Sequence, residues 1–531
     1  MRASFQNRFA PWLMAGVPLL FLILMLIAPV GRLLLEGAWS KQGDASTLWL
    51  APWQDPYLRW RMLWSALQAA LTCGVVLVLG VPIAWVLARL EFRGRAWVLR
   101  SLMLPFVVPT LVAAMGVLVL FGPKGWVVQW GGPNLVGTPY LLLYGNVFFN
   151  LCVLVRAATE GLEQVSASRM AAARTLGATP WRAFWRVEWP AILPWLMSAL
   201  CLVFLYCFSG FGLALVLGGQ HYTTVEVEIY TLVAHELQLA QAGVLALWVL
   251  LFTGGLAWIY AWVESRLAGP VRADRIARRR PQTASQWLAL AAALVVLVIF
   301  CLAPLVAIVM RAAQTGAAGW GILLNPETLD AVWNTVRFSA SALVLATLLG
   351  LIHALAAQRV IWLRTLVFLP FVVSPILVAF GLLLLYPRWT ASAPLLVAAY
   401  ALLAYPFVAK SVAAGLDAMP PHLFAAAKTL GANPWRVFWR ITFPLLLPAL
   451  RRGMAFAAAT AVGEFAVTLF LSRPEWATLS TLIYEHLGRP GATHHDAALV
   501  LSCGLMALAL AVFMAIERPS LRSRTDGETY A

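Results

Sequence analysis

Twelve long apolar stretches follow one another along this chain, and each is long enough to cross a lipid bilayer as an α-helix. About 20 apolar residues in a helix span the hydrocarbon layer of a membrane. Hydrophobic residues make up 62% of the chain and charged residues only 11%, a composition that a soluble domain of this size could not keep in solution. We therefore predict an all-α membrane protein with about twelve transmembrane helices. The stretches lie near residues 12–34, 62–88, 97–122, 138–158, 192–217, 240–264, 286–310, 332–357, 363–386, 394–413, 445–470 and 496–517.

The Lys and Arg residues indicate how these helices are oriented. If the N-terminus lies in the cytoplasm, most of the 38 Lys and Arg residues fall in segments on the inner side of the membrane. A bias of this kind sets the orientation of membrane proteins. It predicts a multi-pass protein with its N- and C-termini both in the cytoplasm. The formal net charge of +16 then reflects orientation in the lipid bilayer, and we do not expect nucleic acid as a partner.

One polar passage of 24 residues occurs twice. Residues 171–194 return as residues 425–448 with 16 identities, at a shift of 254 positions. An even number of apolar stretches separates the copies, so both copies face the same side of the membrane and the repeat is parallel. Further matches pair Pro105 with Pro370, Gly116 with Gly381 and Trp64 with Trp333.

The repeat predicts two homologous halves of six helices each. The first half covers residues 1–267 and the second covers residues 286–531. Between them, residues 268–285 form a basic cytoplasmic linker. The repeated passage lies in two polar loops, residues 156–190 and 410–444, which we expect on the cytoplasmic side.

Each copy of the passage predicts a short helix, a turn and a second short helix. In the first copy an Ala-rich start favours a helix, Gly177 ends it with a residue free to adopt positive φ, and Pro180 fits the first turn of the next helix. Trp181, Phe184 and Trp185 then share one face of that helix. An amphipathic helix in the lipid headgroups would also carry such a face. Contact with lipid requires only that a helix be amphipathic and does not require particular residues at particular positions. The two copies keep the same residues in the same register, which favours a protein partner of defined shape.

This passage resembles the signature loop of bacterial ABC importer permeases. That loop reads E-A-A, three residues, Gly, nine residues, I-x-L-P, and both copies keep its spacing, although Ala171 and Ala425 replace the usual acid. The resemblance implies two fused permease halves of the type I importer fold. It also implies that the second short helix of each loop is a coupling helix that inserts into a groove on an ATP-binding subunit. The implied coupling residues are Ala171, Ala172, Gly177, Pro180, Trp181, Phe184, Trp185 and Pro190 in the first loop, and Ala425, Ala426, Gly431, Pro434, Trp435, Phe438, Trp439 and Pro444 in the second.

The fusion of two halves narrows the substrate class by resemblance. Fused permeases are familiar among thiamine importers and ferric-iron importers. Several stretches resemble the thiamine importers more closely, including residues 146–151 and 223–226. This implies import of thiamine or its phosphates by alternating access, with a ferric-iron importer as the alternative. A periplasmic or extracellular binding protein would deliver the substrate, and the permease would lie in the bacterial inner membrane.

The chain carries no nucleotide-binding loop of the form G-x-x-x-x-G-K-[ST]. We therefore expect no cofactor on this chain and no enzyme activity of its own. ATP and Mg would bind to a separate cytoplasmic ATP-binding subunit, present in two copies. A proton-coupled secondary transporter is a more remote alternative, because such proteins carry ionisable residues in several spans and this chain shows little beyond Glu464 and His353.

Glu464 is the acid that stands out in the apolar stretch 445–470. An acid there is costly unless it faces a cavity or a partner, and its counterpart in the first half is Gly210. A cation with aromatic rings would be met by a carboxylate and by aromatic faces, whereas a structural pairing inside the bundle explains the acid equally well. The predicted substrate path comprises Glu464, Phe465, Phe208 and Phe211.

Several His residues and acids lie in the predicted outer loops. Gathered together, they would be a metal-ligand set and would favour iron. Their spacing fits no known motif, however, and outer loops ordinarily carry such residues as solvated surface, so we predict no metal site. The residues are His221, His235, His486, His494 and His495 with Glu226, Glu228 and Asp496.

Overall fold

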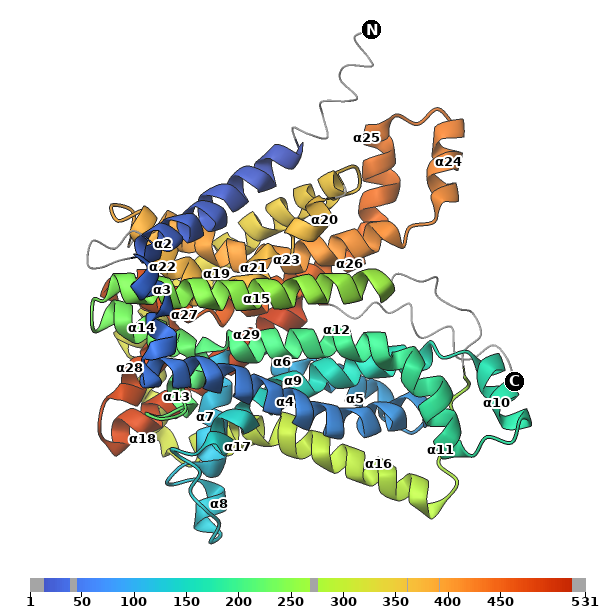
Figure 1. Cartoon of the computed structure of the whole chain (residues 1–531), viewed down its shortest axis with the longest axis horizontal. Coiled ribbons are helices and arrows are strands. Elements are labelled where there is room, and N and C mark those ends of the chain that lie inside the picture. The colour runs from blue at the N-terminus through green and yellow to red at the C-terminus, as the bar shows by residue number, and fades with distance from the viewer. Residues whose placement is uncertain (1–13, 39–44, 268–275, 361, 391, 518–531) are drawn as a thin grey trace.

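The computed structural model describes residues 14–38, 45–267, 276–360, 362–390 and 392–517. Within these ranges every named secondary-structure element is a helix, which confirms the all-α membrane fold (Figure 1). Eleven helices of the described part are long and apolar enough to cross a membrane, or twelve if one bent pair counts as a span. Both chain ends and linker residues 268–275 lie outside the described ranges, so the cytoplasmic location of the two termini stays a prediction.

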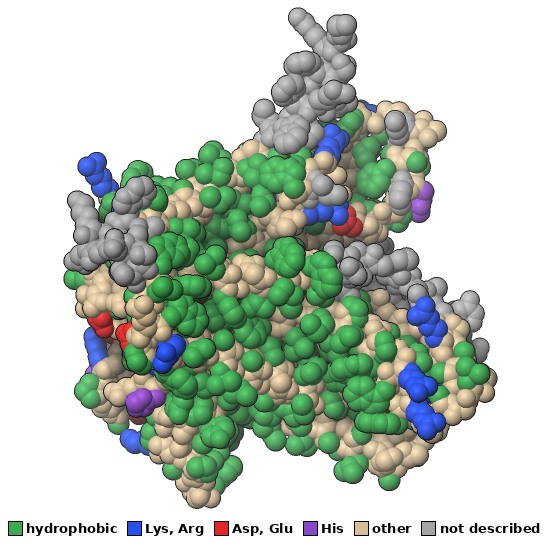
Figure 2. All heavy atoms as spheres, viewed as in Figure 1, with side chains coloured by type: hydrophobic (Ala, Val, Ile, Leu, Met, Phe, Trp, Pro, Cys, Tyr) green, Lys and Arg blue, Asp and Glu red, His purple; other side chains and the backbone are tan. Residues whose placement is uncertain are grey.

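The candidate spans follow the predicted stretches in order. In the first half they are Met14–Glu36, Pro56–Arg89, Thr110–Gln129, Pro139–Glu163, Pro180–Phe208 and Leu239–Val263. In the second half they are Ala284–Ala313, Pro326–Ala357, the bent pair Leu363–Val372 with Pro375–Leu385, Ala393–Asp417, Pro434–Val462 and Ala492–Ile516. Figure 2 shows hydrophobic side chains over the middle of the visible face, with Lys and Arg toward its two ends.

The third and ninth predicted stretches are not single straight helices. In the first half, α6 (Leu104–Val107) ends just before Pro109, and α7 (Thr110–Phe121) follows. In the second half, α21 (Leu369–Val372) and α22 (Pro375–Leu385) meet at a bend of 91°. The bounds predicted for the ninth stretch agree with the bent pair, whereas the third span runs over Thr110–Gln129 and not over 97–122. Hydropathy alone does not reveal the breaks, because a proline is compatible with an apolar stretch but its ring and missing N–H interrupt the helical hydrogen bonds.

The fifth and eleventh predicted stretches are also interrupted. The first breaks after α12 (Trp189–Phe208) and resumes as the short helix α13 (Phe211–Leu217). The second breaks after α26 (Phe443–Val462) and resumes as α27 (Ala466–Leu471). The prediction that Glu464 lies within a span is therefore wrong, because Glu464 lies in the break before α27.

The predicted pairing of Trp64 with Trp333 is off by one residue. Helices α4 (Pro56–Arg89) and α19 (Pro326–Ala357) begin at equivalent prolines, and this register pairs Trp64 with Asn334. Both of these side chains donate hydrogen bonds to backbone carbonyls, Trp64 to Tyr222 at 2.8 Å and Asn334 to Ala477 at 2.9 Å. Trp64 is 3% exposed and Trp333 is 62% exposed, so the two tryptophans lie on different faces of their helices. They were paired because they share a residue type.

The first helix of each half packs against the other half. Helix α2 (Ala28–Ala38) lies against α22 and against α15 (Leu239–Leu267), and α17 (Ala303–Ala313) lies against α7 and α29 (Ala492–Ile516) (Figure 1). Glycines allow both crossings. A Cβ on Gly381 would lie 2.6 Å from the Pro29 carbonyl oxygen, and a Cβ on Gly116 would lie 2.5 Å from that of Pro304. The two halves are thus interlocked.

We expect Gly381→Ala to destabilise the protein, because its new methyl group meets the rigid Pro29 backbone. Gly74→Ala is the matched control, since a Cβ there meets no atom within 4 Å and Ala favours a helix more than Gly does. Thermal unfolding in detergent should show a lower midpoint for Gly381→Ala and an unchanged or higher midpoint for Gly74→Ala. Equal midpoints for the two variants would contradict the interlocked packing.

Candidate coupling loops and membrane cavity

The first repeated loop forms a tight helical hairpin. Helix α10 (Ala167–Thr175) ends at Gly177, whose φ of +78° lies in the left-handed region that favours glycine. The Thr179 hydroxyl then accepts a hydrogen bond from the Arg182 backbone N–H and caps α11 (Pro180–Ala183).

The second arm of this hairpin is not a separate short helix. Helix α11 continues through one π-helical turn, Phe184–Glu188, directly into α12. The fifth predicted stretch, which starts near residue 192, therefore begins too late, because the helical rod already begins at Pro180 and Pro190 lies inside it.

The second loop repeats this geometry. Helix α24 (Pro421–Thr429) ends at Gly431, whose φ is +72°, and Asn433 caps α25 (Pro434–Val437) by accepting from the Arg436 N–H at 2.8 Å. A π-helical turn, Phe438–Thr442, again joins it to α26. The rings of Trp181 and Trp185 lie 5.6 Å apart at 75°, and so do those of Trp435 and Trp439. The two hairpins therefore present the same surface twice.

Each hairpin exposes an apolar stripe. Trp181 is 70% exposed and Trp435 is 67% exposed, and the turn leucines Leu176 and Leu430 are more exposed still. Both hairpins lie at the same end of the molecule (Figure 1). An exposed apolar stripe of this kind is typical of a surface that contacts another protein or lipid. Of the other predicted coupling residues, Ala171, Ala172, Pro190, Ala425, Ala426 and Pro444 are exposed, whereas Phe184 and Phe438 are half-buried beside the tryptophans.

Glu188 anchors the first hairpin, a role that the sequence analysis missed. Its carboxylate pairs with Arg89 at 2.6 Å and accepts from the Trp85 ring N–H at 3.1 Å. Glu188 is buried, and the equivalent residue of the second loop is Thr442. An unlike pair inside a nearly identical repeat was the signal that could have revealed it.

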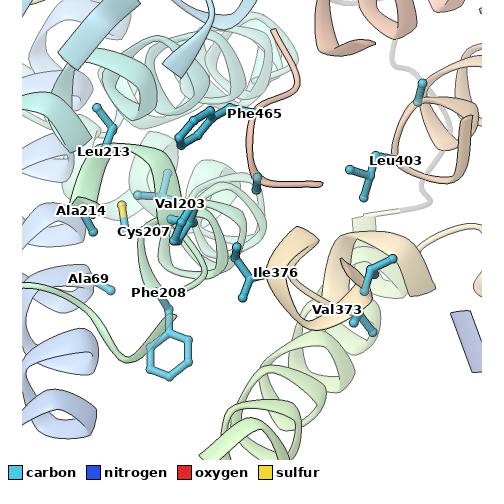
Figure 3. Packing of buried hydrophobic residues seen from close by; sticks show 14 of the residues in the cluster. Ala69, Val203, Cys207, Phe208, Leu213, Ala214, Val373, Ile376, Leu403 and Phe465 are labelled. Atoms are coloured by element: carbon cyan, nitrogen blue, oxygen red, sulfur yellow. The ribbon is translucent and has the colours of Figure 1, made fainter. Parts of the chain in front are cut away.

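A cavity of about 320 Å³ lies between the two halves, near the breaks in the helices. Its walls include Asn146 and Asn150 from α9 (Pro139–Glu163) and Phe407 from α23 (Ala393–Asp417). Glu464 lies on the wall beside the start of α27, where its Oε1 accepts from the Val467 N–H at 3.0 Å. Figure 3 shows that the lining residues Phe465, Leu403 and Val373 come from separate elements.

Four aromatic rings pack together beside the cavity, at the end away from the hairpins, and two of them line it (Figure 1). Phe211 and Phe465, which are equivalent residues of the two halves, stack at 6.0 Å and 20°. Tyr230 packs on Phe211 at 5.5 Å, and its equivalent Tyr484 packs on Phe465 at 5.3 Å. We call these four residues the gate rings. Phe211 and Phe465 also line the cavity, so the structure brings two predicted path residues together with Glu464.

Phe208, the fourth predicted path residue, does not line the cavity. Its ring packs against Phe252 at 4.7 Å and against Phe204 at 6.2 Å. Figure 3 shows Phe208 pointing away from Phe465. The last turn of α12 directs this side chain toward α15, and only the break after it turns the chain toward the cavity.

A hydrogen bond beside the gate rings joins the two halves. Glu226, on α14 (Val225–Ala234) of the first half, accepts from the Ser374 hydroxyl of the second half at 2.7 Å. Glu226 is fully buried, and its other oxygen has no hydrogen-bond partner among the described residues. Burial raises the pKa of this carboxyl to about 8, and the Ser374 hydrogen bond opposes that shift. Ser374 also lines the cavity.

Two of the predicted outer-loop acids, Glu226 and Glu228, are buried rather than solvated. Glu228 is buried and lies 3.4 Å from Arg61, and it accepts from the Tyr57 hydroxyl at 2.8 Å. His486 and His494 contact each other through their Nδ1 atoms at 3.0 Å. Within the described ranges, no group of three or more His, Cys, Asp or Glu residues is arranged to hold a metal ion.

Family comparison supports the twofold architecture of this molecule. The model of the binding-protein-dependent transport system inner membrane component matches residues 80–269 and again residues 346–518. The chain belongs to this family. It is a multi-pass transport permease whose two halves each carry the family domain.

Full-length relatives share the same plan. The thiamine transport system permease protein ThiP of Escherichia coli is 26% identical over 97% of this chain and 98% of its own length. The Haemophilus influenzae ThiP is 27% identical over 86% of this chain and 89% of its own length. The molybdenum transport system permease protein ModB of Mycobacterium bovis is 32% identical and matches 41% of this chain over 89% of its own length. A half of this chain thus corresponds to nearly a whole separate permease.

Proposed function

We propose that this permease imports thiamine or its phosphates into a bacterial cell, driven by ATP hydrolysis on partner subunits. The observation that carries the proposal is similarity to thiamine permeases across nearly the whole chain. In this proposal the hairpins face the cytoplasm, the gate rings face the outer side of the inner membrane, and a periplasmic or extracellular binding protein delivers the substrate there.

The hairpins are the proposed docking sites for two copies of one ATP-binding subunit. Two surfaces with the same ring geometry suit two identical partners better than two different ones. ATP and Mg would bind to those subunits, since this chain has no phosphate-binding loop of its own. Each exposed tryptophan stripe would insert into a groove on one copy.

Helical rods connect the proposed docking sites to the gate rings. One rod runs through Pro180–Phe208 and the other through Pro434–Val462, 29 residues each. A helix of that length extends about 43 Å. Phe211 and Phe465 lie just beyond the far ends of the rods. Movement of the ATP-binding subunits would therefore tilt both rods and separate the gate rings, which is alternating access by rigid-body motion.

The uptake experiment uses the whole complex in proteoliposomes, that is, the permease with its ATP-binding subunits and its binding protein. We expect ATP-dependent accumulation of radiolabelled thiamine and no accumulation of ferric iron. Iron uptake without thiamine uptake would replace the substrate proposal with the alternative. Uptake driven by a proton gradient in vesicles that hold only this chain would overturn the ATP-driven mechanism.

Gly177→Val and Gly431→Val should impair coupling. Each glycine has a positive φ with open space around its Cβ position, so the strain comes from the backbone alone. That strain costs a non-glycine residue about 1–2 kcal/mol. Asn tolerates this conformation, so Gly177→Asn and Gly431→Asn are the matched controls. The Val variants should reach the membrane, copurify with less ATP-binding subunit and transport more slowly than the Asn variants. Equal behaviour of the Val and Asn variants would contradict the role of the turn.

Ser374→Ala tests the outer gate. It removes the single protein partner that the described residues give to Glu226, and an unpartnered buried polar group costs about 1–3 kcal/mol. That cost applies only while the gate is closed, because water reaches Glu226 when it opens. We therefore expect ATP hydrolysis without the binding protein to rise several-fold.

Ser392→Ala is the matched control for the gate variant. Ser374 and Ser392 each cap a helix by accepting from a backbone N–H three residues later, but Ser374 alone of the two bonds across the halves. Both variants lose a cap in the closed and open states alike. If Ser392→Ala raises ATP hydrolysis as much as Ser374→Ala, the bond to Glu226 does not hold the gate.

A further inference from the structure

We propose that the cavity binds its substrate in one fixed orientation between two chemically different walls. The first half supplies the amide oxygens of Asn146 and Asn150, and the second half supplies the Glu464 carboxylate with aromatic rings. The ligand class is an organic cation that carries an aromatic amino group away from its positive charge. This inference rests on the proposed function and names the contacts by which the permease itself would recognise thiamine.

Comparison of equivalent positions in the two halves separates residues that the fold needs from polar residues that occur at the cavity in one half alone. Helices α9 and α23 have the same length and align throughout, and Gly161 and Gly415 fall at the same position in both. Both glycines allow close packing, against Trp195 and Ala449 respectively. The scaffold around the cavity is therefore the same in the two halves, but its polar residues are not. Asn146 corresponds to Tyr400, Asn150 to Ala404, Gln68 to Phe338, and Glu464 to Gly210.

The amide wall is arranged to present acceptors. The Asn146 Nδ2 donates to Gln68 Oε1 at 2.6 Å, and Gln68 in turn donates to the Cys207 carbonyl at 2.7 Å. The Asn150 Nδ2 donates to the Asn146 carbonyl at 2.9 Å and to the Cys207 sulfur at 3.3 Å. Both N–H donors of the Asn150 amide and one of the two of Asn146 are thus bonded to the protein. No donor among the described residues reaches either Oδ1, so two acceptors remain for a ligand.

The opposite wall is arranged to hold a positive charge. Glu464 is the one Asp, Glu, Lys or Arg among the described residues that line the cavity. Its Oε1 caps α27, but α13 starts at the equivalent break with Gly210 and no side-chain cap, so the fold does not depend on this carboxylate. Phe407 contributes a ring to the cavity, with Phe371 of the same half at 5.2 Å, and Phe106 of the first half packs on Phe407 at 5.8 Å. Aromatic faces attract cations, most strongly where water is excluded.

Thiamine matches both walls. It carries an amino group on its pyrimidine ring and a positive charge on its thiazolium ring. The amino group would donate to the amide oxygens of the first half, and the thiazolium ring would lie toward Glu464 and the phenylalanines. The cavity volume of about 320 Å³ falls in the range of small-molecule sites and admits one molecule of this size.

The test measures direct binding to the purified permease with its ATP-binding subunits, without the binding protein. The ligands are thiamine and oxythiamine, in which an oxygen replaces the amino group while the cation is unchanged. Glu464→Gln should weaken both ligands by a similar factor, roughly tenfold, because a charge is lost from the wall that both cations face. Asn150→Leu should weaken thiamine roughly three- to tenfold and leave oxythiamine nearly unchanged, because only thiamine donates to the amide.

Folding should not obscure this comparison. Leu has the same number of side-chain heavy atoms as Asn and the same branching at Cγ, and the groups that Asn150→Leu leaves behind are a carbonyl inside helix α9 and a thiol. Thr159→Val is the control, since Thr159 lies on the same helix as Asn150 and outside the cavity lining, and its hydroxyl donates to the Val155 carbonyl of that helix. It should bind both ligands as the unmodified complex does, and all variants should unfold at similar temperatures.

Three results would overturn the inference. They are equal binding of the two ligands to the unmodified complex, equal loss of both ligands in Asn150→Leu, and no thiamine binding by a complex that still imports thiamine. The last result would leave the proposed function intact. A complex that neither binds nor imports thiamine would overturn the proposed function together with this inference.

Discussion

A lipid bilayer offers no hydrogen bonds to an open backbone, and the architecture of this permease depends on that constraint. Any break in a membrane helix must be covered by protein. The breaks at Pro109, Ser374, Gly210 and Glu464 all lie around one cavity between the halves, where helices of both halves surround them. The freed groups are capped locally, as Ser374 caps α22 and Glu464 caps α27. The same constraint that confines irregular backbone to the centre of the molecule therefore gathers polar groups there.

Interlocking of the halves gives the cavity its walls. Because α2 and α17 each cross to the opposite half, neither half has a complete set of packing partners by itself. Gly116 and Gly381 allow these crossings by bringing backbone against backbone. The broken helices α7 and α22 that carry these glycines begin at the cavity. Relative motion of the halves would therefore be transmitted to the cavity directly, through packed backbone rather than through flexible side chains.

Twofold symmetry and its local violations have separate roles in this molecule. In the proposed mechanism the symmetric features carry the motion: the paired hairpins, the two helical rods and the row of gate rings. The unlike positions are chemical. Glu188 anchors one hairpin by a buried ion pair, Glu226 bonds across the halves, and Glu464 faces the cavity opposite the amides of the first half. A substrate without twofold symmetry needs a binding site without twofold symmetry. Two identical halves could not form such a site.

The sequence by itself determined the membrane class, the two halves and the hairpins, because hydropathy and a repeated passage are local properties of the chain. Gly177 and Pro180 fix a turn through their own backbone chemistry, so their positions could be read without a structure. Tertiary structure alone decided which side chains meet. Phe208 and Phe211 are three residues apart, yet a helix break directs only Phe211 to the cavity. The sequence predicts Glu226 as a solvated residue of an outer loop. In the structure it is bonded to Ser374, which lies 148 residues away in the other half. Contacts of that range depend on how the halves interlock, and no local pattern encodes them.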